Sequence, residues 1–189
     1  TVFNTNNGLP NNRIYSLAEI KDDSARQLWI GTGGGGAAIL NLDSTETTFQ
    51  KISTETSNLI PNDSVLQIFQ DAQKRIYLTT NKGVARLSAI GQLSDFNFQG
   101  YIFTTQDGLP SNECISGASF VDAKGNVWVG TVSGAALLDL SKEFADTTPD
   151  KIYLERSLVG GKERKFSEKS ELPYNENNLV FEYTLLSNF

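Results

Sequence analysis

Residues 107–138 read DGLPSNECISGASFVDAKGNVWVGTVSGAALL, and this stretch decides the fold because the chain repeats it. An earlier copy begins with NGLP at 7–10 and ends with GAAIL at 36–40. Another copy begins with NLIP at 58–61 and ends with GVARL at 83–87. A unit of roughly 40–50 residues that contains several short strands is typical of the blades of a β-propeller.

Each copy carries an aromatic residue in an apolar run and an aspartate six positions before it. The pairs are Asp23 with Trp29, Asp71 with Tyr77, and Asp122 with Trp128. An aspartate bonds the local backbone in a tight turn, and a glycine in the same turn tolerates a positive φ. We therefore interpret the aspartates as turn residues and the aromatic residues as packing anchors between blades.

The apolar runs predict strands in every copy. In the first copy the expected strands are 14–20, 28–32, 37–42 and 48–52. In the second copy they are 65–70, 75–80, 84–87 and 96–104. In the third copy they are 115–121, 126–131 and 135–140, with the fourth strand missing or altered. The central strands are apolar on both faces, as expected for strands packed between neighbouring sheets.

The sequence therefore predicts an all-β fold, with a partial β-propeller of three four-stranded blades over residues 1–143. The expected blades are approximately 1–53, 54–104 and 105–143. A closed propeller typically has 4–8 blades. We expect the remaining blades of the same propeller to cover the two end faces, and the chain alone to associate or aggregate.

After residue 143 the pattern changes. Residues 144–150 are polar and are interpreted as a linker. Runs at 151–158, 163–166 and 178–186 predict strands of a different β unit. A β-sandwich needs about seven strands, so residues 151–189 hold only the beginning of such a domain. The chain starts at Thr1 and contains no methionine, which indicates a piece of a longer polypeptide.

Composition excludes several classes of protein. The net charge is −6 and the pI is about 4.7, which argues against a nucleic-acid partner. The absence of histidine excludes Cys–His and Ser–His–Asp catalysis and histidine-ligated zinc within the chain. The single cysteine, Cys114, is expected to be a small buried apolar residue. We expect no cofactor, no metal site and no membrane-spanning segment in these residues.

The strings quoted above resemble the two-component-regulator propeller repeat. The segment 172–184, LPYNENNLVFEYT, is similar to the start of the Ig-like domain that follows such propellers. The resemblance implies the periplasmic sensor region of a hybrid two-component histidine kinase of Bacteroidetes. It also implies an oligosaccharide ligand, a homodimer in the intact protein, and a membrane anchor and kinase that lie outside this chain.

Other patterns suggest nucleotide-binding, sugar-binding or catalytic sites, but the repeats argue against each of them. Residues 31–36 match the Gly-x-Gly-x-x-Gly dinucleotide fingerprint, but the other copies place a strand-to-strand turn there, where the fingerprint needs a helix. Trp29 and Trp128 could stack on sugar rings, although their register favours packing. The aspartates could act as glycosidase carboxylates, but these must converge within roughly 5–10 Å, which one aspartate per blade does not allow.

The loops that join the blades are the better candidates for binding, because loops on a rigid scaffold commonly carry function. Residues there with side chains that hydrogen-bond hydroxyl groups are Asn12, Arg13, Asn62, Asp63, Asn112 and Glu113. Turn formation alone accounts for Asn12 and Asn112, but it does not require Arg13 or Glu113. We expect these six residues to form the ligand site.

The sequence thus predicts a sensor fragment with no catalytic residues. Two alternatives stay open. One is a fragment of a propeller lyase or glycosidase whose catalytic residues lie in other blades. The other is a scaffold for protein–protein interaction, which would present an apolar patch in place of polar loops.

Overall fold

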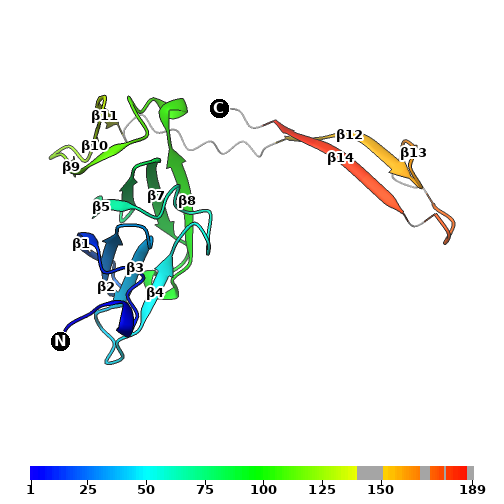
Figure 1. Ribbon diagram of the computed structural model, residues 1–189. Coiled ribbons are helices and arrows are strands. Elements are labelled where there is room, and N and C mark those ends of the chain that lie inside the picture. The colour runs from blue at the N-terminus through cyan, green and yellow to red at the C-terminus, as the bar shows by residue number, and fades with distance from the viewer. Residues whose placement is uncertain (140–150, 167–170, 177, 187–189) are drawn as a thin grey trace. The chain divides into compact units, whose positions relative to one another are not determined.

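The first two copies of the repeat each fold into a four-stranded antiparallel sheet in a computed structural model (Figure 1). The structure describes residues 1–139, 151–166, 171–176 and 178–186. The chain divides into two compact units, Thr1–Glu143 and Phe144–Phe189. The predicted linker at 144–150 lies outside the described residues.

The strands follow the chain order within each sheet. The first sheet contains β1 (Ile14–Lys21), β2 (Arg26–Thr32), β3 (Ala37–Asn41) and β4 (Phe49–Ile52). The second contains β5 (Val65–Gln70), β6 (Ile76–Thr80), β7 (Gly83–Ala89) and β8 (Phe98–Phe103). The third contains β9 (Cys114–Val121), β10 (Val127–Thr131) and β11 (Gly134–Leu138). Short 3₁₀ helices are η1 (Thr5–Asn7), η2 (Leu93–Asp95) and η3 (Thr105–Asp107).

The predicted all-β fold is confirmed, and the strands match the expected ranges to within about two residues at each end. Among the described residues the third sheet has three strands, whereas the first two have four. The sheets are therefore blades of one kind, with the third differing where the sequence pattern also weakens.

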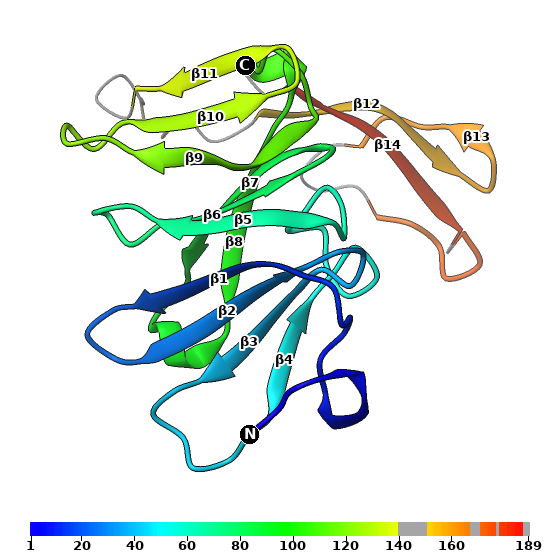
Figure 2. The same ribbon diagram turned by 60° about the vertical axis from the view of Figure 1, so that its left-hand side comes forward.

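The three sheets stack face to face through apolar side chains. The first strands of the sheets, β1, β5 and β9, lie side by side (Figure 2). The core between the first and second sheets includes Trp29, Ile39, Ile68, Leu78 and Leu87. The core between the second and third sheets includes Tyr77, Val84, Cys114, Val127 and Val129. Full burial of one such aliphatic or aromatic side chain contributes about 1.5–3 kcal/mol, so these two interfaces hold the blades together.

Two of the three predicted aromatic anchors lie inside these interfaces, whereas Trp128 is only partly buried and stacks on Phe120 of its own sheet. Trp29 and Tyr77 are completely buried. The Trp29 ring meets Phe98 of the next sheet edge-on, with centroids 5.4 Å apart. Tyr77 stacks on Phe69 within its own sheet at 5.2 Å.

Side chains also bridge the backbones of neighbouring sheets. The Oγ of Ser16 on β1 accepts a hydrogen bond from the backbone N–H of Ile68 on β5, at 3.0 Å. The Gln67 amide of β5 bonds both backbone groups of Ser119 on β9, at 2.7 and 3.0 Å. First strands have one free edge, and unpaired backbone groups that are buried cost free energy. The neighbouring blade satisfies those groups.

A threonine closes the turn between the second and third strands of every blade. In each blade the threonine hydroxyl donates to the carbonyl oxygen of the turn glycine at 2.8 Å. The pairs are Thr32 with Gly36, Thr80 with Gly83, and Thr131 with Gly134. These glycines have positive φ, and at Gly36 a side chain would also place its Cβ 2.1 Å from the Ile52 carbonyl oxygen. The recurrent Thr and Gly of the repeat are therefore one turn motif.

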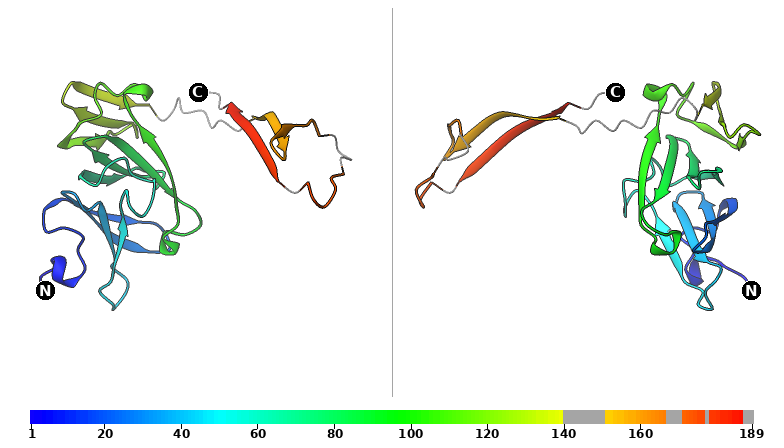
Figure 3. Two further views of the ribbon diagram at one scale, coloured as in Figure 1. Left: turned by 45° about the vertical axis from the view of Figure 1, so that its right-hand side comes forward. Right: turned by 180° about the vertical axis from the view of Figure 1, so that it is seen from behind.

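The second unit contains β12 (Lys151–Val159), β13 (Lys162–Glu163) and β14 (Leu179–Leu186), in the order β13-β12-β14. Both views of Figure 3 show β12 and β14 running alongside each other. The hairpin before β13 turns at Gly160 and Gly161, which both have positive φ. The three predicted strands are present, although β13 is shorter than expected. The Ig-like identity of this unit stays a prediction.

The turn motif predicts that a Thr-to-Val substitution has opposite effects on stability at Thr80 and at the adjacent buried Thr79. Thr80→Val removes the bond to Gly83 and the bond that Thr80 accepts from the Lys82 N–H. We expect a loss of about 1–2 kcal/mol in the free energy of unfolding. The hydroxyl of Thr79 is buried without a hydrogen-bond partner, so Thr79→Val should raise stability by up to about 1 kcal/mol. Urea unfolding measures both variants. Equal effects at the two positions would contradict the motif.

Candidate functional site

The polar loops at the starts of β1, β5 and β9, with the turns after β2 and β4, form what we call the loop face. It comprises the segments 10–13, 32–36, 53–64 and 110–113. Four of the six residues predicted to bind ligand have side chains that bond the protein's own backbone or a neighbouring side chain. The other two do not, and this difference divides the predicted site.

Asn12 and Asn112 fix the helices that precede their strands. The Asn12 side-chain oxygen accepts from the Thr5 N–H at 2.8 Å, and that of Asn112 accepts from the Thr105 N–H at 2.7 Å. The bond is the same in both blades. These asparagines therefore shape the loop, which is the role that turn formation alone predicts.

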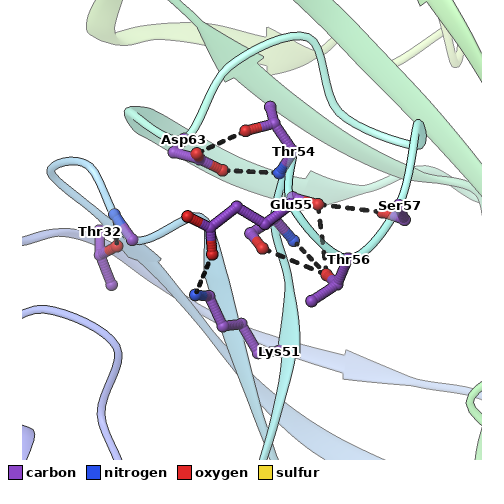
Figure 4. Close-up of polar contacts among 9 residues, drawn as sticks. Thr32, Lys51, Thr54, Glu55, Thr56, Ser57 and Asp63 are labelled. Atoms are coloured by element: carbon purple, nitrogen blue, oxygen red, sulfur yellow. Dashed lines mark hydrogen bonds and ion pairs between the residues drawn. The ribbon is translucent and has the colours of Figure 1, made fainter.

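Asp63 bonds Thr54 within its own segment, as Figure 4 shows, and the glycine turn of the first blade. Its carboxylate accepts from the backbone N–H of Thr54 at 2.8 Å and from the Thr54 hydroxyl at 2.6 Å. Its carbonyl oxygen accepts from the N–H groups of Gly34 and Gly36, at 3.0 and 2.8 Å. The Asn62 side chain accepts from the Ser64 N–H at 2.8 Å. Both predicted ligand residues of the second blade thus hold the backbone in place.

The loop after β4 supports this arrangement. The Thr56 hydroxyl bonds Ser53. Lys51 Nζ lies 3.9 Å from the Glu55 carboxylate, and Figure 4 shows this ion pair. The segment from 53 to 57 is therefore held by local hydrogen bonds next to Asp63.

Arg13 and Glu113 are exposed at the loop face, as is Asn12, but among the described residues the side chains of Arg13 and Glu113 form no hydrogen bond or ion pair. They occupy the same position in their blades: the carbonyl of Arg13 accepts from the Gly33 N–H at 2.8 Å, and that of Glu113 accepts from the Val132 N–H at 3.0 Å. The face consequently presents a cation on the first blade and an anion on the third.

Arg13 is packed on an aromatic ring. Its guanidinium carbon lies 5.7 Å from the centroid of Tyr15, which is a cation–π distance. A Cβ at Gly33 would lie 2.6 Å from Arg13 Cδ and 3.0 Å from the Tyr15 ring. The glycine turn therefore makes room for the stacked pair. Tyr15, two residues after Arg13, was not predicted from the sequence as part of the site.

Two of the three repeated aspartates bond the aromatic anchors. The buried Asp71 carboxylate accepts from the Tyr77 hydroxyl at 3.0 Å and from Arg75 Nε at 2.7 Å. Burial, together with the charge of Asp71, raises the pKa of Tyr77. Asp122 accepts from the Trp128 indole N–H at 3.1 Å, and this bond, together with those from Asn126 and Lys124, lowers the pKa of Asp122 to about 2.

The first blade differs, and the predicted anchor Asp23 is wrong. Asp22 holds this turn by accepting from the N–H groups of Ser24 and Ala25, at 2.7 and 2.9 Å. Asp22 lies seven residues before Trp29. The turn is therefore one residue longer, and the adjacent aspartate takes the role.

The indole of Trp29 bonds a glutamine. Its N–H donates to Gln27 Oε1 at 2.9 Å, and the Gln27 amide donates to the Leu93 carbonyl at 2.9 Å. The three turn aspartates are thus bound by donors of their own hairpins, and Asp22 also accepts from the Leu93 N–H of the next blade at 2.9 Å. These contacts are those of turn residues and not of a shared pair of catalytic carboxylates.

The dinucleotide fingerprint is also a turn. Residues 33–36 connect β2 to β3, and no helix follows them. In the described part of the chain, no three His, Cys, Asp or Glu side chains are grouped so that they could hold a metal ion. Burial raises the pKa of the Cys114 thiol, which keeps it protonated and unreactive. Of the helices the structure describes, none is long and apolar enough to cross a membrane.

The comparison with protein families agrees with the repeat. Residues 8–34 match the model described as "Two component regulator propeller". The matched segment runs from the first NGLP turn through β1 and β2 into the glycine turn. The chain therefore contains a two-component-regulator propeller repeat, and the resemblance found in the sequence is confirmed for this segment. No relative is found among curated proteins.

Solved structures resemble the chain in fold. One is the extracellular domain of a protein described as the hybrid two component system BT4673 from B. thetaiotaomicron, with 17% identity and a TM-score of 0.53. The match covers 87% of the present chain and 25% of the solved chain. Another is the extracellular domain of a system described as BT3049 from the same organism, with 16% identity and a TM-score of 0.47. This match covers 98% of the present chain and 31% of the solved chain. The chain thus spans about a quarter to a third of these structures.

The two tryptophans provide a pH test of the site geometry. The lowered pKa of Asp122 means that its bond to Trp128 is intact above the ordinary pKa of 3.8 and is lost as the pH falls toward about 2. Trp29 bonds the amide of Gln27, which does not titrate. We expect the Trp128 indole N–H signal in NMR spectra to shift with a midpoint near pH 2, while that of Trp29 shows no such titration.

Asp122→Asn is the control, since it should abolish the titration of the Trp128 signal. Movement of both indole signals with one midpoint, in a chain that is still folded, would contradict the assignment.

Proposed function

We propose that this chain is part of the ligand-sensing region of a two-component sensor. The observation that carries the proposal is the two-component-regulator repeat at residues 8–34 within a stack of blades. The fold similarity to the extracellular domain of a hybrid two component system supports it. The proposed location is accordingly the periplasm, with attachment to the membrane only through segments outside the chain.

We propose an oligosaccharide as the ligand and the loop face as its binding surface. A guanidinium donates several hydrogen bonds in a fixed plane, and a carboxylate accepts them from hydroxyl groups. Arg13 and Glu113 supply these groups, and the Tyr15 ring beside Arg13 is partly exposed. A sugar that stacks on Tyr15 while its hydroxyls bond Arg13 and Glu113 fits this chemistry.

The remaining loop residues would contribute by holding the site in one shape. Asp63 ties the glycine turn to the loop after β4, and Asn12 fixes η1. A binding surface that is already ordered does not lose conformational entropy when the ligand arrives. In this proposal, four of the predicted ligand residues act on the backbone instead of the ligand.

To transmit a signal, ligand binding must shift the equilibrium between two arrangements of the sensor. Ligand binding would favour one arrangement of paired sensors over another by its differential affinity for the two. The second unit, which we propose to be the start of the Ig-like domain, would pass this change to a kinase outside the chain. The chain itself would supply recognition and no catalytic residue.

Calorimetric titration of oligosaccharides tests the proposal. A panel of neutral and acidic oligosaccharides is titrated against the 189-residue chain and two variants. Loss of one charged hydrogen bond costs about 1.5–3 kcal/mol, so Arg13→Ala and Glu113→Ala should each weaken binding by about tenfold or more. Glu46→Ala removes an exposed carboxylate outside the loop face and should leave the affinity unchanged. Binding that both loop-face variants retain would overturn this site, and failure of every oligosaccharide would overturn the ligand class.

A further inference from the structure

The outer strand of the second blade, β8, has one free edge. β8 pairs with β7 and with no other described strand. It lies at the margin of the stack, away from β1, β5 and β9 (Figure 1). The second blade has a neighbouring sheet on each of its faces, so further blades at the two ends of the stack would cover other surfaces. The free edge of β8 therefore belongs to the blade itself and not to an end of the stack.

The pairing with β7 determines which backbone groups face this edge. The Ile90 N–H bonds the Asn97 carbonyl at 2.8 Å, so these two residues form a hydrogen-bonded pair that continues the register of the sheet. Hydrogen-bonded and non-hydrogen-bonded pairs alternate along an antiparallel ladder. The N–H and C=O groups of Phe98, Gly100 and Ile102 accordingly point away from β7, toward the free edge.

The edge can accept a strand without a rearrangement of the core. The Phe98 ring packs edge-on against Trp29, with centroids 5.4 Å apart. A Cβ at Gly100 would lie 2.8 Å from Cδ2 of Leu87, so this position also faces the interior. The residues that offer their backbone at the edge are therefore already packed on the side of the first sheet.

β8 also lacks the features by which proteins keep edge strands apart. These features are short strands, lysine, proline and bulges. Residues 96–106 contain no charged residue and no proline. The six residues of β8 pair with β7 without a register shift, whereas β4, the outer strand of the first sheet, has four residues and carries Lys51. Of these two outer strands, β8 is therefore the one that is open to pairing.

We propose that β8 pairs in antiparallel orientation with β8 of a second copy of the chain. A twofold axis at Gly100 would place Gly100 opposite its own counterpart and Phe98 opposite Ile102. Every outward N–H of these residues then meets a carbonyl, and the contact is self-complementary, as a twofold interface requires.

Charge favours the same contact between two copies. Each chain has a net charge of −6, so identical chains repel each other over most of their surface. The uncharged edge of β8 is where two copies can approach with little repulsion. The inference goes beyond the proposed function, because the pairing needs no ligand, and it would give paired sensors a defined contact.

Amide hydrogen exchange of the 189-residue chain, measured by NMR at two concentrations, tests the contact. Pairing of two strands buries a small area, so the dimer should be weak and should form at about 500 µM but not at about 20 µM. The outward N–H groups of Phe98, Gly100 and Ile102 should exchange about 2–10 times more slowly at the higher concentration. The N–H groups of Gln99 and Tyr101, which bond β7, should be protected at both concentrations.

This measurement separates the proposed contact from other association. Contacts through the outer faces of the first and third sheets would not protect the outward amides of β8. Equal exchange of those amides at both concentrations would overturn the proposal. That holds whether they are free throughout or are protected throughout by another part of the same chain.

Ile102→Pro tests the edge directly. Proline removes one outward N–H and places its ring in the path of the partner, and an edge strand tolerates it because the ladder to β7 does not use this N–H. The variant should lose the concentration-dependent protection of Phe98 and Gly100. Ile102→Val is the matched control, since it keeps the N–H and should retain that protection. Protection that survives Ile102→Pro would contradict the contact.

Disulfide cross-linking tests the register without a proline. With the axis at Gly100, Gln99 lies opposite Tyr101 of the partner subunit at about 4.5 Å between Cα atoms, whereas identical positions lie about 7–8 Å apart, too far for a disulfide. A mixture of Gln99→Cys and Tyr101→Cys chains should therefore form a cross-linked dimer that neither variant forms alone. Cys114 is buried and should not react. A mixture that cross-links no better than the separate variants would overturn the proposed pairing.

Discussion

The free edges of the first strands impose the constraint on which the rest of this structure depends. β1, β5 and β9 pair with a neighbour on one side only, so their other backbone groups need partners from outside the sheet. Ser16 and Gln67 supply those partners across the boundary between blades. The same boundary buries Trp29 and Tyr77. Hydrogen bonding and apolar packing therefore both require each blade to lie against the next.

This stacking also determines what the loop face can do. Because β1 and β9 lie on either side of β5, Arg13 and Glu113 begin strands that share one end of the stack. Asp63 connects the first blade to the second at the same end. The loops are consequently held by both blades, which suits the proposed recognition of a ligand that spans several blades.

The sequence predicted the strands well because every copy reinforces the same pattern of apolar runs and turns. It predicted less of the site, since hydrogen bonds of individual side chains leave no periodic signal. Asp63 is a polar loop residue, as a ligand-binding residue would be, yet its carboxylate bonds Thr54. The spacing of six residues before Trp29 predicts Asp23 as the turn aspartate, but one extra residue in the turn gives that role to Asp22. The role of Thr80 becomes visible only in the folded turn.

Amide hydrogen exchange measured by NMR tests the central claim, that side chains of one blade satisfy the backbone edge of the next. A net hydrogen bond contributes about 0.5–1.5 kcal/mol, or roughly a factor of 2–10 in exchange. Ser16→Ala should accelerate exchange of the Ile68 N–H by this factor and leave Ser119 unchanged, and Gln67→Ala should do the reverse. Exchange rates of both amides that neither substitution alters would contradict the stacked-blade account.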